Sequence, residues 1–492
     1  MKKILYTAIF LCSLLFNAQK NTLLNADFWK GKPSVETIKT EIEKGNSPSE
    51  FNNNAFDPVA IAINNGSNLE TVKFLVEQKG NSVDKLTHDG RLYLHWAAMT
   101  GNAEVIEYLI KKGSKIDQLD TKGLTPLAFA ATSGVNNPKV YELFFNAGIS
   151  PKAKYKNGAN ILLLSIGNDK DGTLQKLFEA KGLKITDKDD KGNTAFDYAA
   201  TYGNIDFLKS LQAKGIKATG TALINAAQGT RRSSNGINVF QYLIDEVKIN
   251  PTSTSEDGAT ALQLIARKPK QLEIINYLLG KGVDANKTDA EGNNALMVAA
   301  GGNDIDNVKI LAENTKNINA QNKNGESALS HAIKSGNPMI VETLISKKAD
   351  INVLDSKGNN LGFYLVQSYK PTKAGEKSDF DTKLNLLNQA GFDVSTPQKD
   401  GSTLLHLAVA KNDLGLLKKL EPLKININAV DKEKMTALHK AALIAKDDSI
   451  LKYLVTLGAN KSLKTEFDET AYDLAMENES LKKNNTDLQF LK

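Results

Sequence analysis

The sequence predicts an all-α repeat solenoid, in which helix-turn-helix units stack on one another and are joined by turns that resemble β-hairpins. Two observations predict this fold class: the same order of turn, helix, turn and helix recurs along the chain, and it recurs at a nearly constant spacing. With Gly90 as a register residue, the pattern advances 344 residues to Lys434 in ten steps, or 34.4 residues a step. A fixed period of this length is typical of stacked supersecondary units. The register residues are Gly90, Gly123, Gly158, Gly192, Thr219, Gly258, Gly292, Gly325, Gly358, Gly401, Lys434 and Asp468.

Each part of the unit has a physical reason. A glycine at the register position allows the positive φ of a tight turn, and an Asp three residues earlier, such as Asp120, can bond to its own turn. The first helix ends in small residues, such as Ala97-Ala98, which allow neighbouring helices to approach closely. The second helix carries apolar residues at helical spacing, such as Val105 and Leu109. Because one unit cannot bury these faces alone, the units are expected to stack.

At these residues the chain resembles the ankyrin repeat family. The resemblance rests on Asp120-x-x-Gly123-x-Thr125-Pro126-Leu127 with Ala130-Ala131, and on the copy from Gly90 to Gly113. It extends from about Asn21 to the C-terminus. The resemblance implies a scaffold that binds another protein through its hairpin tips and the first helices on its concave side. It does not imply the identity of that partner, because a fold does not determine a function.

The first 19 residues are interpreted as a secretory signal peptide. Lys2 and Lys3 precede the apolar stretch Ile4–Phe16, which is too short to span a bilayer. Cleavage is expected near Ala18-Gln19, although Phe16 is a poor residue at the −3 position. The alternative interpretation is a buried N-terminal helix. An exported protein, periplasmic or secreted, is therefore expected.

Cys12 is the only cysteine, and it lies in the segment expected to be removed. The mature protein is therefore expected to lack disulfides and cysteine ligands. A lipoprotein would need lipidation at Cys12, but Leu11 stands where a small residue is expected. No second long apolar run follows, so no integral membrane segment is expected in the mature chain.

The rest of the chain is divided by how well it follows the repeat. Residues 20–54 are expected to form a degenerate N-terminal capping unit, 55–465 about twelve tandem repeats, and 466–492 a C-terminal capping half-repeat with a polar tail. The Thr219 and Gly358 units carry extra residues between their helices. The Gly158 unit lacks the small-residue pair, which makes its packing hard to predict.

The charge argues against nucleic-acid binding. The chain has 62 Lys and Arg against 56 Asp and Glu, a net charge of +6. Without Lys2 and Lys3 the mature chain is close to +4, and no dense basic run remains. A monomer with a protein partner of unknown identity is expected.

The search for catalytic chemistry predicts no enzyme, no cofactor and no metal. His95, His406 and His439 occupy the same register position, and in the ankyrin family this histidine is a structural hydrogen-bonding residue between adjacent turns. The Asp187–Gly192 stretch resembles the start of a calcium loop but has Lys191 where an oxygen ligand is needed. We interpret it as a hairpin turn. No phosphate-binding loop, zinc motif or nucleophile motif is found.

The predicted protein-binding surface consists of residues beside the register glycine and after the alanine pair, which are expected to be free of packing contacts. Exposed apolar residues at such positions often mark interfaces, although these side chains could instead pack against the next hairpin. A competing surface lies on the long interhelical loops. The predicted residues are His88, Arg91, Met99, Thr100, Leu119, Leu124, Asp190, Asn193, Thr201 and Tyr202, and the competing loops carry Arg231, Arg232, Lys370, Lys373 and Lys377.

Two narrower functions remain open beside the general scaffold. Exported bacterial proteins similar to this one are associated with protection against peroxide alongside a catalase, and a catalase gene next door would favour that role. A secreted effector that acts on a host is the other alternative. No motif in the residues distinguishes among these.

Overall fold

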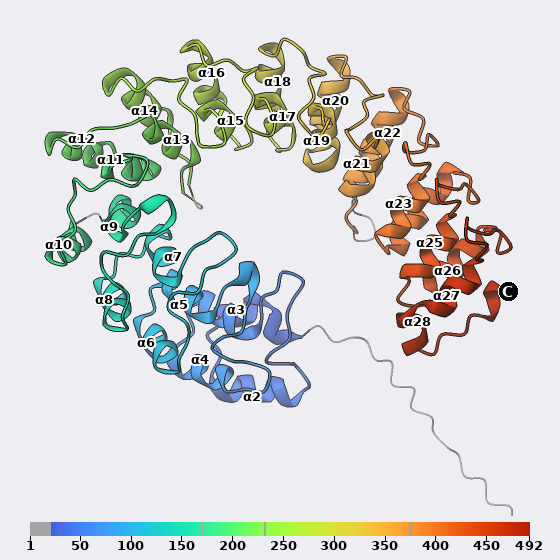
Figure 1. Cartoon of the computed structure of the whole chain (residues 1–492), viewed down its shortest axis with the longest axis horizontal. Helices are drawn as coiled ribbons and strands as arrows, with labels where there is room; N and C mark the ends of the chain where they lie inside the picture. Colours follow the sequence, from blue (N-terminus) through green and yellow to red (C-terminus); the bar gives the residue numbers. More distant parts are fainter. Residues whose placement is uncertain (1–20, 170, 231–232, 373–375, 377) are drawn as a thin grey trace, which may run out of the picture. The chain divides into compact units, whose positions relative to one another are not determined.

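The computed structural model describes residues 21–169, 171–230, 233–372, 376 and 378–492 (Figure 1). The chain divides into two compact units, Met1–Thr219 and Gly220–Lys492. Both are built from paired helices, and the bridges between hairpin residues are isolated ones, such as Thr254 with Thr260. The predicted all-α repeat solenoid is therefore confirmed. The predicted signal peptide, with Cys12, lies outside the described residues.

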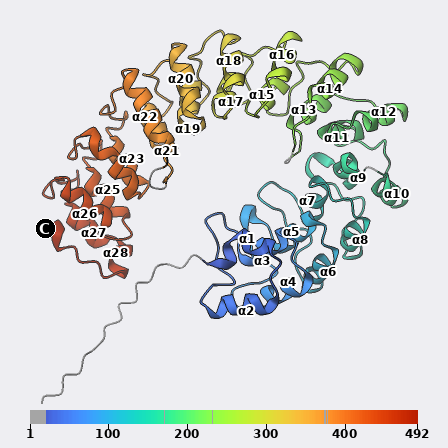
Figure 2. The same cartoon turned by 180° about the vertical axis from the view of Figure 1, so that it is seen from behind.

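In unit 1 the first helices form one row and the second helices form another (Figures 1 and 2). Each first helix packs against the first helix of the next repeat, as α5 does against α7. The first helices are α3 (Pro58–Asn64), α5 (Tyr93–Thr100), α7 (Pro126–Thr132), α9 (Ile161–Ser165) and α11 (Ala195–Ala199). The second helices are α4 (Leu69–Val76), α6 (Ala103–Lys111), α8 (Pro138–Asn146), α10 (Thr173–Ala180) and α12 (Ile205–Ala213).

Unit 2 repeats the same two-row arrangement (Figure 2). Its first helices are α13 (Thr221–Gln228), α15 (Ala261–Ala266), α17 (Ala295–Ala300), α19 (Ala328–Ser335), α21 (Leu361–Ser368), α23 (Leu404–Ala410), α25 (Ala437–Ile444) and α27 (Ala471–Glu477). Its second helices are α14 (Ile237–Gln241), α16 (Leu272–Gly280), α18 (Ile305–Glu313), α20 (Pro338–Ser346), α22 (Asp379–Gln389), α24 (Leu414–Leu420), α26 (Ser449–Thr456) and α28 (Glu479–Lys483).

The core lies between the two rows of helices. The alanine pairs at the ends of the first helices, including Ala97-Ala98 and Ala441-Ala442, are buried. Val105 and Leu109 of α6 are buried as well. Small side chains in the first row and branched ones in the second row therefore pack together between neighbouring repeats.

Extra helices cover both ends of the repeat array. Before the first repeat, η1 (Thr22–Leu24) and α1 (Ala26–Lys30) pack against α3, and α2 (Val35–Glu43) packs against α4. After α28, the tail ends in η8 (Gln489–Leu491), where Leu491 is buried. These segments cover apolar faces that would otherwise meet water.

The irregular units follow the sequence pattern with local changes. The Gly158 unit replaces the end of its first helix with the 3₁₀ turn η4 (Ile166–Asn168), and both Ser165 and Ile166 are buried. The extra residues of the Thr219 and Gly358 units lie between α13 and α14 and between α21 and α22. Among the basic residues of these loops, Arg231, Arg232, Lys373 and Lys377 are outside the described residues, and Lys370 is exposed.

Candidate functional site

The register residues of the hairpins have the backbone conformation that the sequence predicts. The register glycines from Gly90 to Gly401 have φ between 68° and 84°, and Lys434 and Asp468 have φ of 55° and 64°. Ala55, with φ 57°, is a further register residue that the sequence pattern did not reveal. The prediction for Thr219 is wrong: its φ is not positive, and α13 begins two residues later without a hairpin turn. A β-branched residue disfavours positive φ, which explains the difference.

Where an Asp stands three residues before the register residue, its carboxylate organises the turn. In the Gly123 hairpin, Asp120 Oδ1 accepts hydrogen bonds from the N–H groups of Lys122 and Leu124, both at 2.9 Å. Asp189 makes the same pair of bonds in the Asp187–Gly192 stretch, which confirms a hairpin turn there. Equivalent bonds are made by Asp289, Asn322, Asp355 and Asp431.

Backbone hydrogen bonds join the tips of adjacent hairpins in unit 2. In most of these bonds, the donor is the backbone amide two residues before the register residue of one hairpin. The acceptor is the carbonyl of the residue just before the register residue of the preceding hairpin. A row of such bonds stiffens the hairpin edge, because each tip is held by its neighbour. The bonds run from Ala290 to Asp257 (2.6 Å), Lys323 to Glu291 (2.9 Å), Ser356 to Asn324 (2.8 Å), Lys399 to Gly358 (3.0 Å), Lys432 to Asp400 (2.9 Å) and Glu466 to Glu433 (3.4 Å).

The histidines at the common register position bridge adjacent repeats, as predicted. His95 Nδ1 accepts from the Leu92 N–H at 3.1 Å, and its Nε2 lies 3.2 Å from the Leu124 carbonyl of the next hairpin. These partners require a neutral ring protonated on Nε2. Burial lowers the pKa of His95 to about 4. His406 and His439 make the same pair of contacts, to Met435 and Leu463 respectively.

Glutamine performs the same bridging function in one repeat, which the sequence analysis missed. Gln263 Oε1 accepts from the Thr260 N–H at 2.7 Å, and its Nε2 donates to the Asn293 carbonyl at 2.7 Å. Gln263 lies five residues after Gly258, as His95 lies five after Gly90. The register position would have identified it.

Arg91 is not available on the surface, and the prediction that it is free of packing contacts is wrong. It is 3% exposed, and its Nε and Nη2 atoms each lie 2.9 Å from Asp120 Oδ2. Its guanidinium also stacks 4.2 Å from the Phe129 ring centroid. A planar cation that pairs with a carboxylate and covers an aromatic face is stable inside a protein, so Arg91 joins two repeats.

The other predicted residues divide between packed and accessible positions. Tyr202 is half-buried and its ring lies against Gly167, so close that an added Cβ on the glycine would meet it at 2.1 Å. His88 is half-buried and stacks on Phe56. Asp190 is exposed at its hairpin, with its N–H bonded to the Asn157 carbonyl. Thr100 and Leu119 are exposed, whereas Met99, Leu124, Asn193 and Thr201 are half-buried.

Exposed apolar side chains recur at one hairpin position, four residues before the register residue. The large ones are between 45% and 55% exposed, and Pro397 is exposed at the same position. In unit 2 this position is apolar in three consecutive repeats, at Leu354, Pro397 and Val430. Of these residues, only Leu119 was predicted from the sequence. The large exposed members are Phe51, Leu86, Leu119, Leu354 and Val430.

The last two repeats add further exposed apolar groups. Leu443 and Ile444 at the end of α25, and Met476 near the end of α27, are each 43–47% exposed. Helices α25 and α27 pack against each other, so these ends are neighbours. Phe467, in the hairpin that precedes α27, is 75% exposed. We call these four residues, together with Val430, the C-terminal apolar surface: Val430, Leu443, Ile444, Phe467 and Met476.

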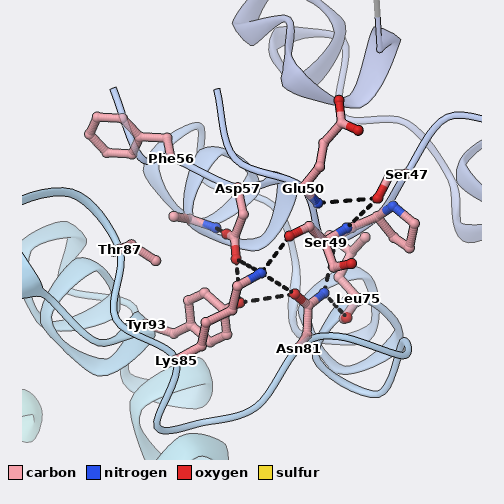
Figure 3. Close-up of polar contacts among 12 residues, drawn as sticks. Ser47, Ser49, Glu50, Phe56, Asp57, Leu75, Asn81, Lys85, Thr87 and Tyr93 are labelled. Carbon is pink, nitrogen blue, oxygen red and sulfur yellow. Dashed lines mark hydrogen bonds and ion pairs between the residues drawn. The ribbon is translucent and has the colours of Figure 1, made fainter. Parts of the chain in front are cut away.

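A buried polar network near the N-terminus is structural in character (Figure 3). Asp57 Oδ2 accepts from Lys85 Nζ at 2.8 Å and from the Tyr93 hydroxyl at 2.5 Å. Lys85 Nζ also donates to the Ser49 carbonyl (2.6 Å) and to Asn81 Oδ1 (2.8 Å). Burial and the Asp57 carboxylate raise the pKa of Tyr93. All three donors of Lys85 are used, so the network fastens the segment before α3 to the next repeat.

Two further features were searched in the part of the chain that the structure describes. In it, no group of three or more His, Cys, Asp or Glu side chains is placed to hold a metal ion. No described helix has both the length and the apolar character needed to cross a bilayer.

Comparison with known proteins places this arrangement among repeat proteins. The family model for ankyrin repeats (3 copies) matches residues 59–155, 262–355 and 374–481. The human transient receptor potential cation channel subfamily A member 1 is 24% identical over 418 residues, 84% of this chain and 31% of that protein. An ankyrin repeat protein of Rickettsia felis is 27% identical over 309 residues, 60% of this chain and 76% of that protein.

The likeness to solved structures is partial. The ankyrin repeat domain of Bcl-3 matches 45% of this chain and 95% of its own, at 22% identity and a TM-score of 0.35. This chain spans 31%, 18% and 10% of the lengths of three curated relatives that it matches, the channel subunit, the E3 ubiquitin-protein ligase KEG of Arabidopsis thaliana and the mask-1 protein of Caenorhabditis elegans.

Proposed function

Because the chain belongs to the ankyrin repeat family, we propose that it is a scaffold that binds another protein through its hairpins and the ends of its first helices. The observation that carries this proposal is the C-terminal apolar surface. Large apolar side chains exposed together are uncommon on monomeric proteins and often mark interfaces. Five such residues come from two consecutive repeats, and Phe467 is 75% exposed.

Packing within the fold does not require these residues. The two positions that Leu443 and Ile444 occupy are Arg267 and Lys268 in the Gly258 repeat and Gln367 and Ser368 in the Gly358 repeat. Since the same fold accommodates polar side chains there, the apolar pair supports a role in binding. Leu354 and Pro397 extend the exposed apolar positions along the hairpins of the preceding repeats.

A paired charge substitution tests the proposal. Leu443→Glu with Ile444→Glu places two carboxylates on the C-terminal apolar surface, where both side chains are already in contact with water. The matched control is Leu272→Glu with Met339→Glu, because these exposed apolar residues lie at the starts of the second helices α16 and α20. Each purified variant is used to capture proteins from a cell-envelope fraction, and captured proteins are quantified by mass spectrometry.

We expect the first variant to lose a specific partner that the wild type and the control retain. Circular dichroism and thermal unfolding verify that both variants are folded. If the first variant retains the partner at full affinity while the control loses it, the binding face has been assigned to the wrong side of the array.

We further propose that the protein acts as an exported, non-enzymatic monomer. Lys2, Lys3 and the apolar stretch Ile4–Phe16 support export. The near-balanced charge of the remaining chain supports a protein partner rather than a nucleic acid.

A further inference from the structure

One hairpin position of unit 1 presents apolar side chains in three consecutive repeats and lysines in the next two. The position is four residues before the register residue. Its three apolar residues, in chain order, are 45%, 54% and 55% exposed, and both lysines are exposed as well. The position therefore has an apolar end and a basic end. We call these five residues the unit 1 stripe: Phe51, Leu86, Leu119, Lys154 and Lys188.

Hydrogen bonds between neighbouring hairpins hold the parts of the unit 1 stripe in place. His88 Nδ1 lies 2.9 Å from the Asn54 carbonyl, which joins the first two hairpins. Stacked helices lie about 8–10 Å apart, so the side chains of the stripe follow one another at roughly that interval. The other joining bonds run from the amide of Thr121 to the carbonyl of Asp89 and from the amide of Asp190 to the carbonyl of Asn157, both at 2.9 Å.

The fold does not require apolar side chains at this position. In unit 2 the same position is Thr254, Thr288 and Gln321 in three consecutive repeats. In unit 1 the Phe51 ring lies against Lys85, whose Nζ is 4.5 Å from the ring centroid and is held by the network of Figure 3. The ring therefore has a fixed place, although Phe51 remains 45% exposed. Exposed apolar side chains gathered in this way often mark interfaces.

The basic end of the unit 1 stripe is reinforced by its own hairpin. Lys152, Lys154 and Lys156 are all exposed, and residues 150–159 include no acidic residue. Within the part of the chain that the structure describes, none of these three lysines forms an ion pair. Their charges are therefore available to a partner.

The wider charge of unit 1 changes sign along the stripe. Residues 21–120, which hold the apolar end, have 11 Lys or Arg and 14 Asp or Glu, a net charge of −3. Residues 121–219, which hold the basic end, have 14 Lys and 9 Asp or Glu, a net charge of +5. A partner that fits the whole stripe must therefore present different chemistry at its two ends.

We propose that the unit 1 stripe binds a protein whose contact face carries apolar side chains beside a group of carboxylates. This proposal rests on the proposed scaffold function and names the chemistry of a partner for a second surface. The apolar side chains of the partner cover Phe51, Leu86 and Leu119, and its carboxylates pair with Lys154 and Lys188. Charge complementarity at one end fixes the direction in which the partner lies along the stripe.

An anionic membrane or a nucleic acid matches this surface less well than a protein does. Both present negative charge along their whole length. The apolar end of the stripe carries exposed Asp84 and Asp117, two residues before Leu86 and Leu119 respectively. Lipid headgroups or phosphates would repel these carboxylates, whereas a protein can place carboxylates at the basic end alone.

A defined acidic peptide tests the stripe in the full chain. The probe is an acetylated and amidated peptide of about 16 residues, in which alternating Leu and Ser precede alternating Glu and Ser. Five repeats span on the order of 40 Å, which about 16 residues can reach at about 3.3 Å each. The chain is labelled at its leucine methyl groups for NMR, and the signals of Leu86 and Leu119 are followed during the titration.

We expect saturable shifts of both leucines with the acidic peptide. The same peptide with Gln in place of Glu should bind about tenfold more weakly, because several exposed charge pairs are lost together. This comparison changes only the peptide, so it does not depend on whether a variant of the protein folds.

Charge reversal with rescue locates the carboxylates of the partner. Lys154→Glu with Lys188→Glu should weaken binding of the acidic peptide about tenfold, and should gain binding of a peptide with Lys in place of Glu. The fold should be kept, because both lysines are exposed. The matched control is Lys287→Glu with Lys323→Glu, which makes the same change of charge at exposed hairpin residues of unit 2. It should bind as the wild type does.

The outcomes distinguish this inference from the broader function. Equal binding of the Glu and Gln peptides, or no saturable shift of Leu86 and Leu119, overturns the proposal. Vesicles of phosphatidylglycerol and phosphatidylcholine are titrated in parallel, and vesicles that displace the peptide from these leucines would overturn it in favour of a membrane. Failure of the scaffold proposal would instead appear in the capture experiment, as an unchanged partner for the Leu443 and Ile444 variant.

Discussion

Because His95 bridges two repeats, we predict that low pH lowers the free energy of local opening around it, and that replacing His95 with glutamine removes this pH dependence. The perturbation is His95→Gln, compared with His95→Ala. His95 is fully buried, and both ring nitrogens are engaged, Nδ1 by the Leu92 N–H and Nε2 by the Leu124 carbonyl. A second proton would remove the acceptor that the Leu92 N–H needs. Gln263 makes the same two contacts in another repeat without a titrating group.

The magnitude follows from the pKa of His95, which burial lowers from 6.5 to about 4. The unfolded chain binds the proton more readily than the folded one, so the stabilisation is complete above pH 6.5 and is lost as the pH falls towards 4. Between pH 7 and pH 5 this linkage amounts to about 2 kcal/mol for His95. Burial also lowers the pKa of His406 and His439, so acid acts in the same direction at those repeats.

Hydrogen–deuterium exchange of residues 92–100 measures the effect where it occurs, because a long repeat array need not unfold as one unit. For the wild type, we expect the free energy of local opening to fall by about 2 kcal/mol from pH 7 to pH 5, after correction for intrinsic exchange rates. His95→Gln should lose most of this pH dependence and keep its protection at pH 7. His95→Ala should lose protection at both pH values, because it leaves the Leu124 carbonyl without its donor. A glutamine variant with the pH dependence of the wild type would refute the reasoning.

The remaining predictions concern the hairpin turns and the predicted signal peptide. Gly292→Ala should destabilise the protein more than Gly123→Ala does. Both residues have positive φ, which costs about 1–2 kcal/mol for alanine. Only at Gly292 would the new Cβ also meet a backbone atom, the nitrogen of Lys323, at 2.9 Å. Equal shifts in the midpoint of urea unfolding would contradict the contact argument. Lys434→Gly should stabilise the last repeats by up to about 1 kcal/mol, since lysine is strained at φ 55°; a lower melting temperature would count against this. Finally, the intact mass of the native protein should lack about nineteen N-terminal residues, and recovery of Met1–Gln19 from a cytosolic fraction would exclude export.

Several features of the fold could be predicted because their causes lie within one repeat. The positive φ of the register glycines, the turn bonds of Asp120 and the burial of Ala97-Ala98 depend on residues a few positions apart. The bridging role of His95 could also be predicted, because the period places the same histidine at the same point of successive repeats. These interactions recur every 34 or so residues, so the pattern itself identifies them.

The candidate surface depended on tertiary contacts that the period does not describe. Arg91 was expected at the surface, yet it is buried because Asp120 and Phe129 of the next repeat provide a carboxylate and an aromatic face for it. Tyr202 lies against Gly167, since a residue without a side chain leaves room for the ring.

By itself, the sequence determined the family, the stacking period and the chemistry of each turn. Only the tertiary structure decided which apolar residues remain in contact with water. Phe467 and Val430 lie in hairpins that the repeat pattern locates, but their exposed fractions of 75% and 47% depend on which neighbouring segments cover them. The exposure of a side chain depends on what a neighbouring repeat covers, whereas the geometry of a turn depends on the residues of the turn itself. A repeating sequence therefore encodes turn geometry more directly than exposure.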